Sequence, residues 1–421
     1  MVVGSGGREH ALVEALAASP LQPEMYVAPG NPGIARIAEV VDIPADDLTS
    51  LRDFAVENEI DLTVVGPEAP LIGGIVECFW EAGLEIFGPP RPAARIEGSK
   101  VFSKELMRHA GVPTADFEVF DREAAALAYL RTRREYPVVV KADGSAAGKG
   151  VTVARSREEA EVAVRASFGG LYGAAGERVI IEEHLSGREA SVFVITDGRN
   201  VLPFLPAQDY KAAYDNNEGP NTGGMGAYSP LMWMEPSTYA TILEDIIHPT
   251  LKQLALIGAT YSGLLYAGIM VTDDGPKALE FNCRFGDPET QVLLPRLETD
   301  LLELMIACNS GMLEGREVSW STDKAVCVVL ASEGYPESSS SGDEIQGIGN
   351  IPTGVYIYHA GTEERDGRFY TAGGRVLNVV GTGPSLIEAR AKAYAAAEQI
   401  RFDGMQYRTD IALEAIELED I

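Results

Sequence analysis

The chain has 421 residues, with 63 acidic and 34 basic side chains, which give it a formal net charge of −29. At roughly 150 residues per domain, this length predicts two to four domains, with cores large enough to need no disulfide or metal. The charge excludes a nucleic-acid partner, because the overall field would repel a phosphate polyanion. A small anionic substrate must therefore be held by local positive groups.

The cysteines and histidines predict neither a disulfide framework nor a metal cluster. The four cysteines have no CxxC spacing, and no two of the five histidines stand one helical turn apart. We therefore expect free thiols and a cytoplasmic, reducing setting. The N-terminus lacks a basic segment followed by an apolar one, and no apolar run reaches about 18 residues. Neither secretion nor membrane spanning is expected.

Strands and helices alternate at the start of the chain. Apolar runs predict strands at 1–3, 25–28, 62–65 and 84–87, and amphipathic spacing predicts helices through Leu12 and Leu16, over 48–58 and over 74–82. This alternation predicts a doubly wound parallel sheet. The first strand is short against the usual length of about 5–6 residues. Two interpretations of it stay open: a chain start placed a few codons late, or a strand at the edge of the sheet.

Beyond residue 92 the pattern changes to α+β. A compact unit is predicted from strands at 117–120, 138–141, 151–154 and 179–182 and helices at 100–109, 124–131 and 158–168. A second, strand-rich region has strands at 190–195, 202–205, 267–271 and 277–281 and helices at 238–257 and 300–309. After strand 325–330, the polar run 333–343 has loop composition, and strands 355–359 and 376–381 with helix 385–400 complete a small C-terminal module.

The opening strand is followed by a glycine turn, Gly4-Ser5-Gly6-Gly7-Arg8. Glycines between a strand and a helix let backbone N–H groups converge on an anion. The dinucleotide fingerprint needs a third glycine where this chain has Glu9, so a nicotinamide cofactor is disfavoured and a single phosphate or phosphosugar fits better. A tight turn without a ligand stays open as an alternative.

A second glycine run follows the predicted strand that ends at Lys141. The stretch Gly144–Gly150 carries Lys149, and its last Gly-Lys pair is followed by Gly150 and Val151, so it is not a Walker loop. Lysines beside glycines that permit close backbone approach suit a lid over a polyphosphate. The alternative is a surface hairpin.

A charged run, Glu280 to Glu289, stands at the end of another strand. Glu280 and Asn282 point to the same side of that strand, and two oxygen ligands on one face are how Mg²⁺ is usually held. Arg284 continues the alternation, so a guanidinium would lie beside the metal. The alternative is a solvated strand face.

Two weaker signals remain. The run Gly219–Tyr228 is too glycine-rich for a packed element, and its exposed amides would suit an acidic substrate, although a long ordered turn is an equal alternative. Glu182 and Glu183 end a strand, where a carboxylate could reach a base or ribose or simply face solvent.

Five motifs in family order give the chain a resemblance to the ATP-grasp superfamily, and within it to the phosphoribosylamine–glycine ligases of purine biosynthesis. The match covers nearly the whole chain, through Gly4–Leu12 (GSGGREHAL), Val65–Leu71 (VGPEAPL), Glu97–Lys100 (EGSK), Gly219–Pro230 (GPNTGGMGAYSP) and Arg284–Gln291 (RFGDPETQ). The resemblance implies an α/β and α+β multidomain fold. Its expected parts are a Rossmann-like N-terminal domain at 1–93, an ATP-grasp domain at 94–322 with a lid at about 113–185, and a C-terminal α+β domain at 323–421.

The resemblance also implies site roles, residue by residue. ATP is expected at Lys100, Lys141, Gly144, Gly148, Lys149, Gly150, Glu182, Glu183 and Glu189. Mg²⁺ or Mn²⁺ is expected at Glu280 and Asn282. Glycine and 5-phosphoribosylamine are expected at Gly4, Gly6, Gly7, Arg8, Glu9, Pro67, Glu68, Asp209, Lys211, Gly223, Gly224, Met225, Arg284, Asp287 and Glu289. Arg284, Asp287 and Lys141 are the expected catalytic residues.

Two departures from the family pattern stand near these positions. Many relatives have Gln-Asp-His-Lys-Arg where this chain has Gln208 to Ala212, so Tyr210 replaces a histidine and a basic residue is lost at Ala212. Many ATP-grasp enzymes also place a further metal carboxylate one strand before Glu280, at the position that we assign to Met270.

The resemblance implies an ADP-forming ligase that joins glycine to 5-phosphoribosylamine through glycyl phosphate and gives glycinamide ribonucleotide. Such an enzyme needs only small-molecule partners and is expected to be a monomer or a weak homodimer. Another ATP-grasp ligase or carboxylase is the nearest alternative, although a carboxylase would lack the RFGDPE block. A non-catalytic nucleotide-binding protein is a third, disfavoured because Glu280, Asn282 and Lys141 are all present.

Overall fold

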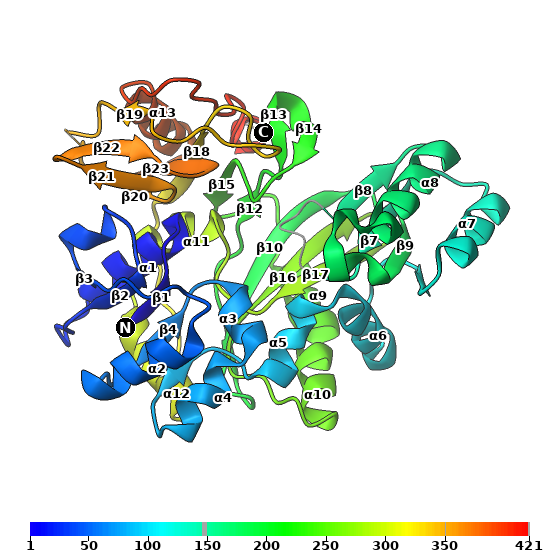
Figure 1. The fold of residues 1–421 in the computed structure, drawn as a ribbon, viewed down its shortest axis with the longest axis horizontal. Coiled ribbons are helices and arrows are strands. Elements are labelled where there is room, and N and C mark those ends of the chain that lie inside the picture. Colours follow the sequence, from blue (N-terminus) through cyan, green and yellow to red (C-terminus); the bar gives the residue numbers. More distant parts are fainter. Residues whose placement is uncertain (145–149, 350, 420–421) are drawn as a thin grey trace.

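The computed structural model describes residues 1–144, 150–349 and 351–419. Its parts lie in a row, with the lid standing out at one end and the N-terminal and C-terminal sheets stacked at the other (Figure 1). Within the described ranges, no helix is long and apolar enough to cross a membrane.

The N-terminal sheet is parallel and has the order β3-β2-β1-β4-β5. Its strands are β1 Val2–Gly4, β2 Tyr26–Pro29, β3 Glu39–Val40, β4 Thr63–Val65 and β5 Ile86–Phe87. The edge-strand interpretation of the first strand is wrong, because β1 lies in the middle of the sheet between β2 and β4. Val2 and Val3 are buried there, so three residues suffice when both neighbouring strands pair with them.

Helices cover this sheet and lead into the next region. They are α1 Gly7–Ala17, α2 Leu48–Glu57, α3 Glu68–Gly73, α4 Ile75–Glu81, α5 Arg91–Gly98 and α6 Lys100–Ala110, with a short 3-10 turn, η1, at Ile34–Arg36. The sequence analysis missed α3 and α5. Each begins directly after a proline, and Pro92 stands in the first turn of α5, where its missing N–H breaks no helical hydrogen bond.

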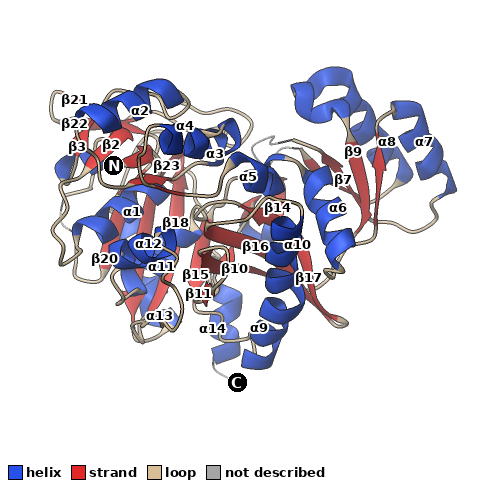
Figure 2. Ribbon diagram, turned by 90° about the horizontal axis from the view of Figure 1, so that it is seen from below, coloured by secondary structure: helices blue, strands red, loops and turns tan. Residues whose placement is uncertain are grey.

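The lid is an antiparallel sheet of order β6-β9-β7-β8, covered by two helices. Its elements are β6 Phe117–Phe120, α7 Glu123–Thr132, β7 Val138–Ala142, β8 Val151–Ala154, α8 Arg157–Ala166, η2 Ser167–Leu171, η3 Gly173–Glu177 and β9 Val179–Glu183. Residues such as Leu130, Val140 and Ile181 form an apolar cluster drawn from this segment alone. The lid therefore has its own core. In Figure 2 its sheet lies apart from the other sheets.

The central sheet has the order β11-β10-β16-β17 and carries the far wall of the cleft described below. It consists of β10 Arg188–Thr196, β11 Val201–Pro203, β16 Gly263–Thr272 and β17 Gly275–Asn282. The predicted helix 238–257 is present as α9 Pro236–Ile242 and α10 His248–Leu256, joined by a wide helical turn at Leu243–Ile247. After the central sheet follow α11 Glu289–Leu293, η6 Leu294–Arg296 and α12 Leu301–Asn309.

The C-terminal sheet crosses the boundary predicted at 323. Its order is β12-β15-β18-β23-β20, and its first two strands come from the preceding region. The strands are β12 Gln208–Asp209, β15 Gly226–Ser229, β18 Lys324–Ala331, β20 Val355–His359 and β23 Arg375–Gly383, with α13 Leu386–Ala397 packed on them. A smaller sheet of β19 Glu344–Ile345, β21 Thr362–Arg365 and β22 Arg368–Thr371 and the short α14 Leu413–Glu419 complete the chain.

The run Gly219–Tyr228 was expected to be an unpacked loop, and for its second half this is wrong. Glu218–Asn221 forms β14, an exposed strand paired with β13 Ala212–Tyr214 after the short turn Asp215–Asn217, but Gly226–Ser229 is the fully buried strand β15. Gly226 is needed because a Cβ would overlap Ile411 and the Cys327 carbonyl at about 2.6–2.8 Å. The glycine at position 226 is therefore explained by close packing inside the C-terminal sheet, and not by a flexible loop.

One apolar cluster joins the three non-lid parts. It contains Val2 and Leu12 from the N-terminal sheet and α1, Phe193 from β10, and Val329 and Val380 from the C-terminal sheet. Because these side chains share one core, the N-terminal, central and C-terminal parts form a continuous body against which the lid stands.

Two buried histidines join the N-terminal part to the C-terminal sheet. The backbone N–H of His359 donates to Nδ1 of His10 at 2.9 Å, and Nδ2 of Asn31 donates to the carbonyl oxygens of Ser5 and His359 at 2.8 Å. Burial lowers the pKa of His10 to about 3, helped by the neighbouring His359, and burial with the nearby Arg36 lowers the pKa of His359 to about 4. Both rings are therefore neutral in the folded chain.

This pair predicts acid sensitivity of the interface. The folded pKa values lie below the usual 6.5, so the stabilisation is complete above pH 6.5 and is lost as the pH falls toward 4. At pH 5 each ring contributes a loss of about 2 kcal/mol in the free energy of unfolding. We expect His359→Gln to flatten the decrease in melting temperature between pH 6.5 and 4.5. An unchanged slope in calorimetric scans would refute the assignment.

Candidate active site

A cleft of about 640 Å³ opens between the lid, the central sheet and the N-terminal and C-terminal parts. Its lid end is lined by residues of α6, β7, β8 and β9, and its other end by Arg8, Glu68, Asp287, Tyr335 and Arg375. Charged side chains of both signs line both ends. The cleft therefore provides the local positive groups that an anionic substrate needs in a chain with a net negative charge.

A buried carboxylate, Glu182 on β9, lies between two lysines at the lid end. Lys104 Nζ lies 2.6 Å from Glu182 Oε2, and Lys141 on β7 forms an ion pair with the other oxygen. Burial raises the pKa of Glu182, but the two lysines outweigh it and the net shift is downward. Burial lowers the pKa of Lys104 to about 8, although Glu182 opposes the shift. Both lysine side chains face the cleft.

Lys100 is placed by the start of α6. Ser99 caps this helix, and the Asp143 carboxylate accepts hydrogen bonds at 2.8 Å from the Ser99 hydroxyl and from the Val101 N–H. The Lys100 N–H donates to the Asp143 carbonyl at 2.8 Å, so the strand that carries Lys141 also fixes Lys100. Lys100 lines the cleft, as expected from the sequence.

Glu280 and Asn282 stand on one face of β17, as the strand alternation predicts. Burial opposes ionisation of Glu280, but Lys100, Lys211 and Lys141 outweigh it and lower the pKa of the carboxyl. No donor among the described residues hydrogen-bonds to the Glu280 carboxylate, while Asn282 Oδ1 accepts from Arg284 Nη2 at 3.3 Å. An ionised carboxylate and an amide oxygen, both turned to a cleft, are a donor set that fits Mg²⁺ or Mn²⁺.

The structure corrects the position assigned to a further metal carboxylate. In the β16–β17 register, the residue opposite Glu280 is Gly268, and Met270 lies two positions farther along β16, opposite Lys277. A Cβ on Gly268 would lie 3.3 Å from Glu280 Cγ, so the glycine leaves room beside that carboxylate. Neither position carries a carboxylate.

Arg284 is held between two carboxylates from the N-terminal part of the chain. Its guanidinium lies 2.8 Å from Glu97 and 3.3 Å from Glu68. The Cys283 N–H donates to the second oxygen of Glu97 at 2.7 Å. Burial acts against the charge of Arg284, but Glu97 and Glu68 more than offset it and raise the pKa. A permanently charged, oriented guanidinium thus stands beside the candidate metal ligands.

A second charged cluster forms the floor of the cleft. Lys211 Nζ lies 2.7 Å from Glu189 and 3.0 Å from Asp209. Burial raises the pKa of Asp209, Lys211 opposes this, and Glu289 and Glu189 add to the rise. Glu289 itself is buried and accepts a hydrogen bond from Ser191 at 3.1 Å.

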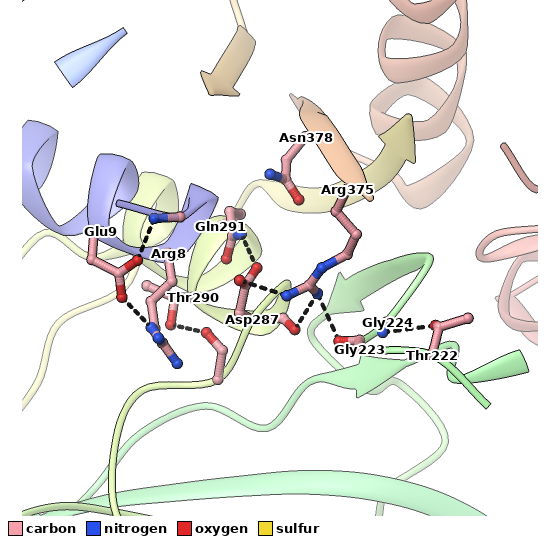
Figure 3. Close-up of polar contacts among 12 residues, drawn as sticks. Arg8, Glu9, Thr222, Gly223, Gly224, Asp287, Thr290, Gln291, Arg375 and Asn378 are labelled. Atoms are coloured by element: carbon pink, nitrogen blue, oxygen red, sulfur yellow. Dashed lines mark hydrogen bonds and ion pairs between the residues drawn. The ribbon is translucent and has the colours of Figure 1, made fainter. Parts of the chain in front are cut away.

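The glycine turn after β1 uses its acidic residue internally (Figure 3). The Gly6 N–H donates to Glu9 Oε2 at 2.6 Å, and Arg8 Nε donates to the other oxygen at 2.6 Å. Glu9 is 2% exposed, so it caps α1 in the place where a dinucleotide-binding fold has its third glycine. Arg8 lines the cleft, and its Nη1 donates to the Phe285 carbonyl at 3.1 Å.

Asp287 connects this region to the C-terminal sheet. Gln291 donates to its Oδ1 at 2.6 Å, and Arg375 from β23 donates to its Oδ2 at 2.8 Å (Figure 3). Burial opposes ionisation, but Arg375 and Arg8 outweigh it and lower the pKa of Asp287. The described cleft therefore combines carboxylates with cations from all parts of the chain.

Family models match the chain in three consecutive pieces. They are the N domain of phosphoribosylglycinamide synthetase over residues 1–97, its ATP-grasp (A) domain over 98–290 and its C domain over 325–414. The chain belongs to the phosphoribosylglycinamide synthetase family. It is 48% identical to a phosphoribosylamine–glycine ligase of Caldanaerobacter subterraneus over 98% of this chain and 99% of that protein. It is also 48% identical to one of Brucella melitensis over 100% and 98%.

Solved structures agree with this membership of the synthetase family. A phosphoribosylamine–glycine ligase from Thermotoga maritima has a TM-score of 0.84 at 35% identity, covering 97% of this chain and 98% of that one. A biotin carboxylase from Campylobacter jejuni has a TM-score of 0.76 at 16% identity, covering 100% and 94%. The second likeness concerns the fold alone, and it confirms the expected three-part ATP-grasp architecture.

Most residues that the synthetase resemblance nominated lie together in the cleft. The lining includes Arg8, Glu68, Lys100, Lys141, Glu182, Glu183, Glu189, Asp209, Lys211, Gly223, Glu280, Asn282, Arg284, Asp287 and Glu289. Gly148 and Lys149 lie outside the described residues. Other nominated residues are described but do not line the cleft, namely Gly4, Gly6, Gly7, Glu9, Pro67, Gly144, Gly150, Gly224 and Met225. Met225 is fully buried, and its backbone is hydrogen-bonded to Tyr210 and Val329.

Sequence reasoning missed four residues that shape the site of this synthetase-family chain. Lys104 stands one helical turn after Lys100, and that spacing was its only signal. Glu97 belongs to the motif Glu97–Lys100, but the sequence analysis assigned no role to it. Arg375 follows a pair of glycines at a strand start, and Tyr335 lies in the polar run that we interpreted as a linker.

The C-terminal segment packs against the departures at residues 210 and 212. Arg408 is buried, lies 4.8 Å from the centre of the Tyr210 ring, and donates to the Ala212 carbonyl at 3.2 Å. Asp410 accepts from it at 2.7 Å. Arg408 is not among the residues that line the cleft, so the loss of a basic residue at Ala212 is not made up in the cleft lining.

The Glu182 pairing predicts the effect of removing Lys104. In Lys104→Met, the buried Glu182 keeps only Lys141, so we expect nucleotide affinity to fall about tenfold and the free energy of unfolding to fall by about 1–3 kcal/mol. Calorimetric binding of MgADP and thermal unfolding measure both effects. The control is Lys252→Met, which removes an exposed lysine from α10. Equal behaviour of the two variants would contradict the role.

Proposed function

We propose that this chain is an ATP-dependent phosphoribosylamine–glycine ligase. The observation that carries the proposal is the sequence Glu280, Asn282, Arg284 at the end of β17, whose side chains share one cleft with Lys100 and Lys141. This arrangement offers two oxygen ligands, a fixed guanidinium and two ammonium groups around one volume, as phosphoryl transfer to a carboxylate requires. The names of the close relatives support the same activity.

The reaction proceeds in two steps that need no covalent enzyme intermediate. A carboxylate oxygen of glycine attacks the γ-phosphorus of ATP, the bond to the β-phosphate oxygen breaks, and glycyl phosphate and ADP form. The amine nitrogen of 5-phosphoribosylamine then attacks the acyl carbon, inorganic phosphate leaves, and the nitrogen loses a proton to give glycinamide ribonucleotide.

The chain's own groups have distinct tasks in these steps. Lys100 and Lys141 bind the ATP phosphates, and Arg284, fixed by Glu68 and Glu97, orients the glycine carboxylate and the transferring phosphoryl oxygens. Arg8, where we expect the phosphate of phosphoribosylamine, lines the opposite end of the cleft with Asp287 and the Gly223 loop, and we place the acceptor there, next to the glycyl phosphate. When bound at Glu280 and Asn282, a divalent cation compensates charge on the phosphoryl oxygens. Walls from the lid and central sheet exclude water, which would hydrolyse the acyl phosphate.

Finer features belong to the same proposal. We assign Mg²⁺ or Mn²⁺ to Glu280 and Asn282, and the division 1–93, 94–322 and 323–421 to the three domains, with the lid at about 113–185. All four cysteines are free thiols, which supports a cytoplasmic setting.

The direct test is product formation from ATP, Mg²⁺, glycine and freshly made 5-phosphoribosylamine. We expect stoichiometric ADP, phosphate and glycinamide ribonucleotide, and little turnover when alanine replaces glycine. Mass spectrometry of the product and coupled ADP detection measure both. No product, or equal turnover with alanine, would contradict the proposed activity.

Glu280→Gln tests the metal-binding carboxylate. The amide keeps the shape but lacks the charge, so we expect kcat to fall by about 10³-fold or more, with an unchanged melting temperature. Glu118→Gln is the matched control, because Glu118 is an exposed glutamate on lid strand β6. Turnover of Glu280→Gln close to that of the control would refute the metal role.

A further inference from the structure

The backbone of one cleft residue, Gly223, is held at both its N–H and its carbonyl by the C-terminal part of the chain. The Gly223 N–H donates to the Tyr335 hydroxyl at 2.9 Å, and the Gly223 carbonyl accepts from Arg375 Nη1 at 2.6 Å. Tyr335 and Arg375 both line the cleft. Gly223 has no side chain of its own with which to fix its position, so these backbone contacts hold it in place.

Arg375 also binds Asp287 (Figure 3). Its Nη1 donates to the Asp287 carbonyl at 2.8 Å and its Nη2 to the Asp287 carboxylate at 2.8 Å. One guanidinium therefore spans the Gly223 loop and the Asp287 loop, and its planar, forked donors fix the angle between them. Together, Tyr335 and Arg375 form a clamp on the acceptor end of the cleft.

Glycines occur where the clamp needs close approach. A Cβ on Gly223 would lie 3.1 Å from the Arg375 guanidinium carbon, and a Cβ on Gly374 would overlap the Tyr335 ring. Gly224 has a φ of +114°, and a Cβ there would overlap Pro288. Gly374, directly before Arg375, therefore lets the tyrosine ring pack against the backbone from which the arginine extends.

The far side of the loop is anchored to the charged floor of the cleft. Thr222 Oγ1 donates to the Lys211 carbonyl at 2.8 Å and accepts from the Gly224 N–H at 2.9 Å. The loop thus lies between the clamp and Lys211, which is ion-paired with Asp209 and Glu189. A shift of Gly223 would change the acceptor end without touching the lysines at the nucleotide end.

We propose that Tyr335 and Arg375 are positioning residues that set the acceptor site for the phosphorylated amine, a proposal that rests on the proposed function. They act through Gly223 and Asp287, while Lys100, Lys104 and Lys141 lie on other elements. Loss of the clamp should therefore weaken use of phosphoribosylamine and leave ATP binding nearly unchanged.

The test compares Tyr335→Phe, Arg375→Lys and Gly374→Ala in the full chain. Tyr335→Phe removes one hydroxyl and Gly374→Ala displaces the tyrosine ring, so neither variant leaves a charge unpaired. These two variants therefore still test the clamp if Arg375→Lys fails to fold. The matched control is Arg390→Lys, because Arg390 also donates to backbone carbonyls of the C-terminal part, those of Thr409 and Ile411, but does not line the cleft.

We expect the KM for phosphoribosylamine to rise about tenfold in each clamp variant, with the KM for ATP changed less than about twofold. Arg375→Gln should be worse than Arg375→Lys, because it loses the charge as well as the fork. A parallel rise of the KM for all three substrates, or an effect no larger than that of Arg390→Lys, would overturn the proposal.

A second readout separates this inference from the proposed function. Deuterium uptake of the peptide covering residues 219–226 should rise in Tyr335→Phe and Gly374→Ala relative to wild type and to Arg390→Lys, because the Gly223 amide loses its acceptor. Unchanged uptake overturns the clamp whatever the activity. If the wild-type chain forms no product but the clamp variants still raise the deuterium uptake of this loop, only the ligase assignment is contradicted.

Discussion

The Asp287 carboxylate is the point at which the N-terminal, central and C-terminal parts of the chain meet. It accepts from Gln291 and Arg375, and its ionised state is favoured by Arg8 from the N-terminal turn. A buried carboxylate is costly unless its oxygens are paired, so the three parts must dock together before this group is satisfied. The position of the acceptor end of the cleft therefore depends on the docking of all three parts.

Pairing of charges within the cleft resolves the conflict between a net charge of −29 and anionic substrates. Glu182 lies between two lysines, Arg284 between two glutamates, and Lys211 between Glu189 and Asp209. Each cluster keeps its cations charged at neutral pH and holds them in place, at the cost of removing both partners from water. The remaining acidic residues lie largely on the outer surface, where they affect solubility more than binding.

Local pattern predicted the elements that carry the chemistry, because β7 and β9 contain apolar runs next to charged residues and the alternation along β17 puts Glu280 and Asn282 on one face. It missed α3 and α5, whose proline starts resemble turns, and it mistook β15 for a loop because glycines there serve packing. The Arg375–Gly223 contact joins residues 152 positions apart, and no spacing rule indicates it. Gly268 opposite Glu280 likewise follows from a strand register with an irregularity, which the sequence does not reveal.

The separate core of the lid gives the two ends of the cleft different mechanical properties. Lid residues such as Leu130 and Val140 pack among themselves, so the lid can shift relative to the central sheet without exposing the shared core. The acceptor end has no such freedom, because Arg375, Tyr335 and the buried histidine pair tie it into one body. Entry of nucleotide and exclusion of water are thereby assigned to the lid. Under the proposed function, recognition of the amine falls to a preorganised surface, which loses little entropy when it binds its substrate.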